Sequence, residues 1–233
     1  MSDLLLVHGT CHGAWCWEDV LEALAAMGQP ARAIDLPGHG EDTTPRERVT
    51  GDDYVERILG SIDAPVTLVG HSMGGFPITA AALAAPERIA RLVYLCAYVP
   101  VPGRNLGQMR RDWPDQPLVP IIRMAEDGAT LTFDPEALEH HFYHDCPEGT
   151  VARARARLTP QPVAAQQAPV AALPDVLRSY IVCTRDRAIP PAYQQHMARD
   201  FAPKDVQRMD VSHSPFFAAP EDLARRLAAL ARD

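Results

Sequence analysis

The sequence lacks the features that mark several classes of protein. No apolar run reaches the length of about 18 residues that would span a membrane. The short apolar run 4–7 has no basic flank of the kind that precedes a signal peptide, so a strand is the better interpretation. Basic residues are outnumbered, with 22 Lys and Arg against 30 Asp and Glu. The resulting net charge of −8 disfavours nucleic acid or an anionic membrane as a partner.

Cysteine is also scarce. The five cysteines are an odd number without a C-x-x-C pair: Cys11, Cys16, Cys96, Cys146 and Cys183. This usage predicts free thiols in a cytoplasmic protein and no disulfide framework. A metal site is not predicted either, because the cluster of His140, His141 and His144 has no acidic residue at a matching ligand spacing. We interpret these histidines as surface or lid residues.

Apolar, strand-like runs alternate with helical patterns along most of the chain. The expected strands are 3–7, 31–35, 66–70, 91–97, 178–183 and 206–210. The expected helices are 15–27, 52–62, 73–85, 191–201 and 220–231. This alternation predicts an α/β fold with a mostly parallel sheet of six strands and helices on both faces. A length of 233 residues and a hydrophobic content of 47% suit a single domain over 1–233.

The alternation breaks down over residues 104–175. This stretch mixes short helical patterns with prolines, and it carries apolar side chains such as Leu118, Leu131 and Phe142. A disordered loop would leave such apolar side chains exposed to water, so their presence indicates a packed segment. We therefore predict a small, mostly helical lid that covers the ends of the strands.

A serine in a tight glycine turn is the most informative feature. The apolar run 66–69 leads into Gly70-His71-Ser72-Met73-Gly74, and a helical pattern follows at once. A strand, a sharp turn and a helix with serine at the apex form a nucleophile elbow, in which the strained turn holds the hydroxyl out of the sheet. The glycines leave room for the close approach of strand and helix. Ser72 is thus predicted to be an enzyme nucleophile.

The nucleophile needs a base, and the base needs an acid that sets its tautomer. In proteins with such a turn, the acid follows the serine along the chain and the histidine follows the acid, each on a loop at the end of a strand. Only His213 lies between the last strand and the last helix, whereas His196 falls within a predicted helix. Asp186 directly follows the strand 178–183, so it is the predicted acid. The other candidates precede their strands or lie too close to His213: Asp175, Asp205 and Asp210.

An oxyanion hole requires two backbone N–H donors. One comes from the residue after the nucleophile, here Met73, and the other from the loop after the first strand. That loop is His8-Gly9-Thr10, in which Gly9 lets the backbone turn. We predict the N–H groups of Thr10 and Met73 as the donors.

Two further motifs resemble a known family. These are Leu-Val-His-Gly-Thr-Cys-His-Gly-Ala-Trp at 6–15 and Asp-Leu-Pro-Gly-His-Gly at 35–40. Together with the serine turn, the segment 181–190 and the loop around His213, they resemble the α/β-hydrolase subfamily of plant methyl salicylate and methyl jasmonate esterases and hydroxynitrile lyases. The resemblance implies an α/β-hydrolase fold and no cofactor, and by analogy a homodimer. It also implies Ser72, Asp186 and His213 as the triad, with Thr10 and Met73 at the oxyanion hole.

The resemblance also bears on the pocket. His12 and Trp15 fall on family-typical positions near it, and we interpret both as structural supports. The candidate residues of the pocket are His12, Phe76, Met109, Trp113, Leu131, Phe142 and Phe216.

Three departures favour hydrolysis over cyanohydrin cleavage. The lyases place a lysine directly after the catalytic histidine to hold cyanide, where this chain has Ser214. They also carry a threonine in place of Gly9 and a glutamate in place of His71. The predicted function is therefore cleavage of a small, partly apolar carboxylic ester. A hydroxynitrile lyase, a lactonase and a small-molecule receptor on a hydrolase scaffold remain as alternatives, whereas an epoxide hydrolase would carry aspartate at the position of Ser72.

Overall fold

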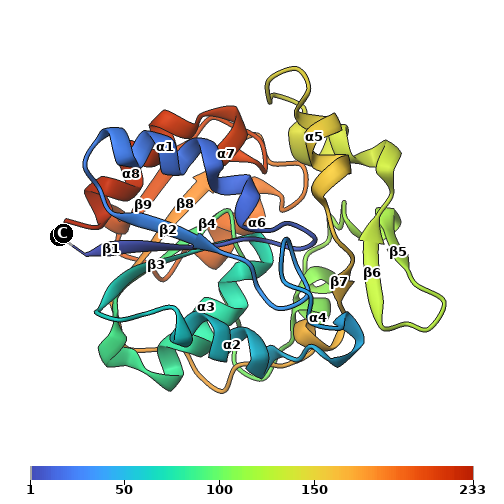
Figure 1. Ribbon diagram of the computed structural model, residues 1–233, viewed down its shortest axis with the longest axis horizontal. Helices are drawn as coiled ribbons and strands as arrows, with labels where there is room; N and C mark the ends of the chain where they lie inside the picture. Colours follow the sequence, from blue (N-terminus) through green and yellow to red (C-terminus); the bar gives the residue numbers. More distant parts are fainter. Residues whose placement is uncertain (1, 233) are drawn as a thin grey trace.

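A six-stranded parallel sheet forms the centre of the computed structural model, which describes residues 2–232 (Figure 1). The strands are β1 (Asp3–Val7), β2 (Ala31–Ile34), β3 (Val66–His71), β4 (Ile89–Leu95), β8 (Arg178–Cys183) and β9 (Val206–Met209). Their order is β2-β1-β3-β4-β8-β9, and every neighbouring pair is parallel. The predicted parallel sheet of six strands is confirmed, with the fourth strand starting two residues earlier than expected.

Helices cover both faces of this sheet because its strands are apolar on both sides. One face packs against α1 (Glu18–Ala26), α7 (Pro215–Ala218) and α8 (Pro220–Leu230), and it buries Leu4 and Leu6 of β1. The other face packs against α2 (Gly51–Gly60), α3 (Gly75–Ala84) and α6 (Pro191–Met197), and it buries Leu5 and Val7. Successive side chains of a strand point to opposite faces, so a continuous apolar run marks a strand covered twice. Figure 1 shows α1, α7 and α8 above the sheet and α2 and α3 below it.

Local signals explain the starts of several helices. Thr50 and Asp53 form a capping box at α2, in which each side chain accepts a hydrogen bond from the other's backbone N–H. Pro220 occupies the first position of α8, where its missing N–H costs nothing. The predicted apolar face of this helix is buried. The remaining short turns of 3-10 helix are η1 (Ala14–Trp17), η2 (Arg46–Arg48), η3 (Ser72–Gly74), η4 (Pro86–Arg88), η5 (Val119–Ile121), η6 (Pro135–Ala137), η8 (Ala164–Gln166) and η9 (Pro203–Asp205).

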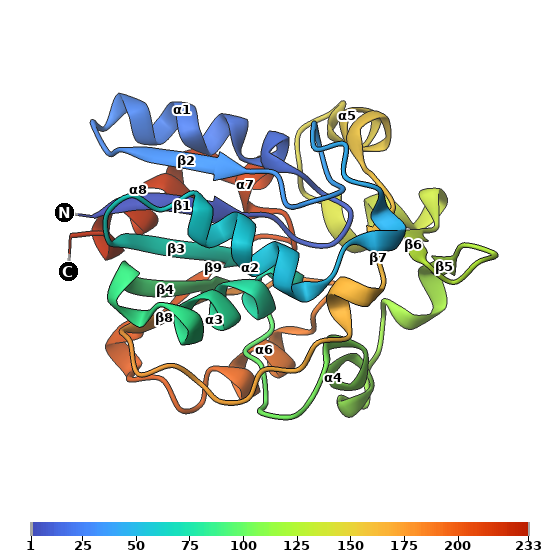
Figure 2. The same ribbon diagram turned by 60° about the horizontal axis from the view of Figure 1, so that its bottom comes forward.

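Most of the predicted lid, residues 104–175, lies beyond the carboxyl ends of the strands, whereas its last part, 163–175, runs back beside α2 and α3 toward β8 (Figure 2). Its helical parts are α4 (Leu106–Asp112), the π-helical turn η7 (Glu139–Tyr143) and α5 (Thr150–Arg157). It also contains an antiparallel sheet of β5 (Ile122–Met124), β6 (Thr130–Phe133) and β7 (Gln161–Pro162), which the sequence analysis did not predict. Strands of two to four residues are too short to show a periodicity of two.

The strand order places a crevice at the lid end of the sheet. From β1 the chain moves outward to β2, then returns to β3 on the other side of β1 and continues to β4. The loops after β1 and β3 therefore diverge to opposite faces at their carboxyl ends, and such a switch point is where α/β sheets bind ligands. Within residues 2–232, no helix combines the length and apolar character needed to cross a membrane.

Candidate active site

Ser72 stands at the carboxyl end of β3 in a strained backbone conformation. Its φ is +54°, in the left-handed region that residues other than glycine seldom adopt. The surrounding backbone maintains this turn, since the Ser72 carbonyl accepts a hydrogen bond from Tyr98 N–H at 3.1 Å. A Cβ on Gly75 would lie 2.0 Å from the Tyr98 carbonyl oxygen, so only glycine permits this close contact. The turn directs the serine side chain away from the sheet.

His213 and Asp186 complete a buried chain of hydrogen bonds with Ser72. His213 Nε2 lies 3.0 Å from Ser72 Oγ, and His213 Nδ1 lies 2.6 Å from Asp186 Oδ2. The exposed fractions are 6% for Ser72, 2% for His213 and 4% for Asp186. Because Asp186 accepts the Nδ1–H, the tautomer leaves Nε2 free to accept the serine proton. The loops after β3, β8 and β9 thus bring together three residues that are up to 141 positions apart.

A set of donors orients the Asp186 carboxylate. Its Oδ1 accepts hydrogen bonds from the N–H groups of Ala188 at 2.7 Å and Ile189 at 2.9 Å. Its Oδ2 accepts from Gln194 Nε2 at 2.8 Å, in addition to His213. Gln194 is fully buried on α6, and its Oε1 in turn accepts from Cys183 N–H at 3.0 Å. Gln194 was not predicted from the sequence. The available signal was a glutamine in the predicted helix 191–201, which follows the loop that carries Asp186.

His71 supports the histidine loop from the neighbouring position of the serine turn. Its Nε2–H donates to the His213 carbonyl oxygen at 2.8 Å. Burial, together with the nearby His213 and His12, holds the pKa of His71 well below its usual range, so the ring is neutral at pH 7. His71 is visible in the sequence only as a residue of the elbow, and its contact with the His213 loop depends on the fold.

One buried group among the described residues has the arrangement of possible metal ligands, namely His71, Cys96 and His213. Both ring nitrogens of His213 already bond Ser72 and Asp186, and His71 Nε2 already donates to a carbonyl. An ion here would have to displace the contacts of the triad. The donor set therefore does not suit a resident metal.

The predicted oxyanion donors flank Ser72. Thr10 lies in the turn after β1, and in residues 2–232 its N–H has no hydrogen-bond partner. Met73 lies in the first turn of η3, where N–H groups have no partner within the helix. A Cβ on Gly9 would lie 2.9 Å from Ser72 Cβ and 2.7 Å from His71 Nδ1, so the 9–10 backbone presses directly against the nucleophile.

The cavity around Ser72 is small. Its volume is about 10 Å³, roughly enough for one water molecule. Its walls are Thr10, His12, His71, Ser72, Tyr98, Arg110, Leu118, Phe133, Phe142 and His213. Phe142 and His12 were among the candidates, whereas Tyr98, Arg110, Leu118 and Phe133 were not. A substrate enters only when lid side chains move.

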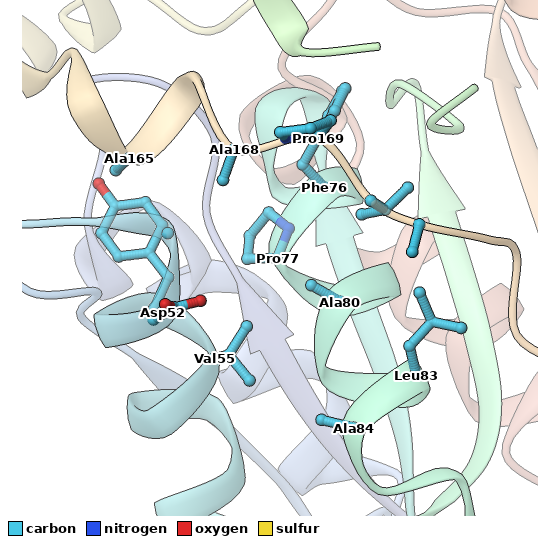
Figure 3. Close-up of a pocket in the computed structure, with 14 residues that line it drawn as sticks. Asp52, Val55, Phe76, Pro77, Ala80, Leu83, Ala84, Ala165, Ala168 and Pro169 are labelled. Atoms are coloured by element: carbon cyan, nitrogen blue, oxygen red, sulfur yellow. The ribbon is translucent and has the colours of Figure 1, made fainter. Parts of the chain in front are cut away.

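The other candidate wall residues lie elsewhere. Phe76 lines a separate pocket of about 330 Å³ between α2, α3 and the segment that carries Ala168 and Pro169 (Figure 3). Phe76 is not among the residues that line the cavity of Ser72. Trp113 stacks on Tyr193 with ring centroids 4.9 Å apart, and it lines a third pocket together with Met109. Phe216 and Leu131 belong to the packed core and do not line the Ser72 cavity. None of these five residues lines the cavity of Ser72 in this structure, and their role toward a substrate stays a prediction.

His12 holds the oxyanion loop by both ring nitrogens. Its Nδ1–H donates to the Thr10 carbonyl oxygen at 2.9 Å, and its Nε2 accepts from the Tyr143 hydroxyl at 2.8 Å. The ring stacks on Trp15 at a centroid distance of 5.5 Å. Burial lowers the pKa of His12 to about 3, so the ring is a neutral structural link between the lid and the loop after β1.

Buried neutral histidines predict a loss of stability in weak acid. Burial lowers the pKa of His8 to about 4 and that of His12 to about 3, against 6.5 in the unfolded chain. Below pH 6.5 the unfolded state therefore binds protons that the folded state does not, and the free energy of unfolding falls as pH falls. These two residues are expected to remove on the order of 3 kcal/mol between pH 6.5 and pH 5.

Urea unfolding measured from pH 8 to pH 5 checks this expectation. The His12→Gln variant is the control, because its stability should depend less steeply on pH. A free energy of unfolding that stays constant from pH 7 to pH 5 would contradict the assignment of neutral buried rings.

Comparison with known proteins agrees with the geometry. A model of the Alpha/beta hydrolase family matches residues 4–226. The chain belongs to the alpha/beta hydrolase family. The hydrolase is 32% identical to Methylesterase 7 of Arabidopsis thaliana over 247 residues, which cover 97% of this chain and 95% of that protein. It is 28% identical to Salicylic acid-binding protein 2 of Nicotiana tabacum, and the match covers 97% of this chain and 96% of that protein.

Solved structures resemble the hydrolase over its whole length. A pyrethroid hydrolase from Sphingobium faniae JZ-2 superposes with a TM-score of 0.88 at 27% identity, covering 99% of this chain and 97% of that one. The methylesterase MES16 from Arabidopsis gives a TM-score of 0.86 at 26% identity, covering 100% and 99%. The expected fold class and the resemblance to plant methylesterases are thereby confirmed. The family and these relatives support carboxylic-ester hydrolase activity.

Proposed function

We propose that this hydrolase cleaves a small carboxylic ester through an acyl-enzyme intermediate on Ser72. The observation that carries the proposal is the continuous chain of hydrogen bonds from Ser72 through His213 to Asp186, at 3.0 and 2.6 Å. A serine hydroxyl is a weak nucleophile unless a base accepts its proton during attack. This geometry provides that base in the correct tautomer.

In the first half-reaction, Ser72 Oγ attacks the ester carbonyl carbon while His213 Nε2 accepts the hydroxyl proton. The resulting oxyanion is stabilised by the N–H groups of Thr10 and Met73. Collapse of this intermediate expels the alcohol, which receives its proton from His213. In the second half-reaction, water attacks the acyl carbon while His213 Nε2 accepts a proton from it. The bond to Ser72 Oγ then breaks, His213 returns the proton to Ser72 Oγ, and the acid is released.

Two positions support hydrolysis over cyanohydrin cleavage. Ser214 is fully buried after the base, and its hydroxyl introduces no positive charge there. Gly9 leaves no space for a side chain, since a Cβ would come within 3 Å of both His71 and Ser72. A lactonase would use the same steps on a cyclic ester, so it is a variant of the proposal. A receptor would not require a strained serine in contact with a base.

Trapping the acyl-enzyme tests the proposal. Mixing the hydrolase with p-nitrophenyl butyrate should give a burst of p-nitrophenol. A rapid acid quench should then preserve the acyl-enzyme, and one butyryl group should be found on the peptide that contains Ser72. The control is the same reaction after the protein is unfolded in urea. Turnover without labelled Ser72, or cleavage of mandelonitrile in place of the ester, would refute the mechanism.

We also propose a cytoplasmic location for this small-molecule enzyme. All five cysteines are free, and four of them are buried in the core. A compartment that keeps thiols reduced suits such a protein.

A further inference from the structure

Arg110 places a positive charge in the cavity of the nucleophile. It lies on α4 of the lid and lines the small cavity together with Ser72 and His213. Its Nη2 donates to Thr10 Oγ1 over 3.4 Å, a long contact. Its Nε is buried without any hydrogen-bond partner. Among residues 2–232, no carboxylate lies within 4.0 Å of this guanidinium.

This arrangement differs from that of Arg91, an arginine that is buried in the fold. Arg91 pairs with Asp205 at 3.2 Å and donates to Ser179 Oγ at 2.8 Å, so its charge is neutralised inside the protein. Arg110 is half-buried, and its Nε lies out of reach of water without a charged partner, so part of its hydration is lost without compensation. Burial accordingly lowers the pKa of Arg110, and Tyr98 is the main neighbour that opposes this effect.

Arg110 also stands between two cavities. The first surrounds Ser72, and the second is bounded by the segment 115–119 and by Tyr193. Both cavities share three wall residues, Tyr98, Arg110 and Leu118. The outer cavity also borders exposed lid residues, among them Asp115. A ligand that passes from the lid surface to the nucleophile therefore meets the guanidinium.

We infer that Arg110 binds a carboxylate carried by the substrate, so that this hydrolase acts on half-esters of short dicarboxylic acids. The inference rests on the proposed ester hydrolysis at Ser72 and names its substrate class. A guanidinium offers paired N–H donors that match the two oxygens of a carboxylate. Because Arg110 contacts the side chain of Thr10, whose N–H is a proposed oxyanion donor, only a few bonds separate the carboxylate from the reacting carbonyl.

The test compares monomethyl glutarate with dimethyl glutarate, which differ in the free carboxylate. For the unmodified enzyme, we expect kcat/KM to be at least tenfold higher for the monomethyl ester, since a charged hydrogen-bonded pair is worth about ten- to a hundredfold. In Arg110→Gln this ratio should fall to about one. Arg111→Gln is the matched control, because Arg111 is exposed on the same helix and should keep the original ratio.

A binding measurement separates this inference from the proposed function. In Ser72→Ala, which cannot turn over, glutarate should raise the melting temperature, and the rise should vanish in Ser72→Ala/Arg110→Gln. Serine-dependent hydrolysis of both esters at equal rates, with no glutarate binding, would overturn the role of Arg110 and leave the esterase intact. Glutarate binding through Arg110 without any ester hydrolysis would instead overturn the proposed function. The preference for monomethyl over dimethyl glutarate is measured on the unmodified enzyme. The inference can therefore be tested even if Arg110→Gln folds poorly.

Discussion

Replacing Ser72 with alanine is expected to lower kcat for p-nitrophenyl butyrate by about a million-fold, to near the uncatalysed background. In the proposed mechanism the Ser72 hydroxyl is the only group of the triad that forms a bond to the substrate, and without it His213 has no proton to accept. The side chain lies in a cavity of about 10 Å³, so the alanine variant should fold normally. Steady-state hydrolysis at matched enzyme concentration, with a thermal melt beside it, provides the measurement.

Ser214→Ala is the matched control for this variant. Ser214 is fully buried in the same loop as the base, and its hydroxyl has no hydrogen-bond partner among the residues described. Removing it should change kcat by no more than a few-fold. If Ser72→Ala kept more than a hundredth of the activity, the nucleophile would have to be sought elsewhere.

The second large effect is expected for Asp186→Asn, with kcat lower by about ten thousand-fold. Both oxygens of Asp186 accept hydrogen bonds, Oδ1 from two backbone N–H groups and Oδ2 from Gln194 and His213. An amide NH2 must replace one of these acceptors. If it faces the ring, His213 must present Nδ1 as an acceptor, and Nε2 then carries the proton toward Ser72 and cannot act as a base.

Asp210→Asn distinguishes this tautomer effect from a general loss of charge. Asp210 lies three residues before His213 and accepts a hydrogen bond from Thr184 Oγ1 at 2.8 Å on the exposed side of the loop. Its replacement should leave kcat within a few-fold of the original value. Equal losses for the two variants would mean that overall charge near the loop, and not the tautomer of His213, controls the rate.

The framework of the fold was predictable because hydrophobic periodicity reports burial directly. The strands predicted at 3–7 and 178–183 match β1 and β8 residue for residue. Helix ends were less accurate, as α6 stops at Met197 and not at the predicted 201. Fraying and short 3-10 turns decide those last residues, and they leave little trace in a hydrophobic pattern.

The lid was harder to predict because its structure depends on contacts between distant segments. The β6–β7 pairing aligns Leu131 with Gln161, thirty positions later, and β7 contains only two residues. No local pattern encodes such a pairing. The surroundings of the candidate pocket residues depend on the same long-range packing, since Phe76 and Trp113 line pockets other than the cavity of Ser72.

Local chemistry in the sequence determined the parallel sheet and the serine turn, and it was enough to predict Ser72, Asp186 and His213 as the triad. Strand periodicity, glycine spacing and chain order all act over short distances, so they are visible in a linear string of residues. Only the tertiary structure decided that Gln194 and His71 hold the acid and the base, and that Arg110 enters the cavity without a counterion. Those facts depend on which side chains come into contact at the carboxyl ends of the strands. Such contacts join residues that are distant in sequence, so they are determined by the packing of the whole chain.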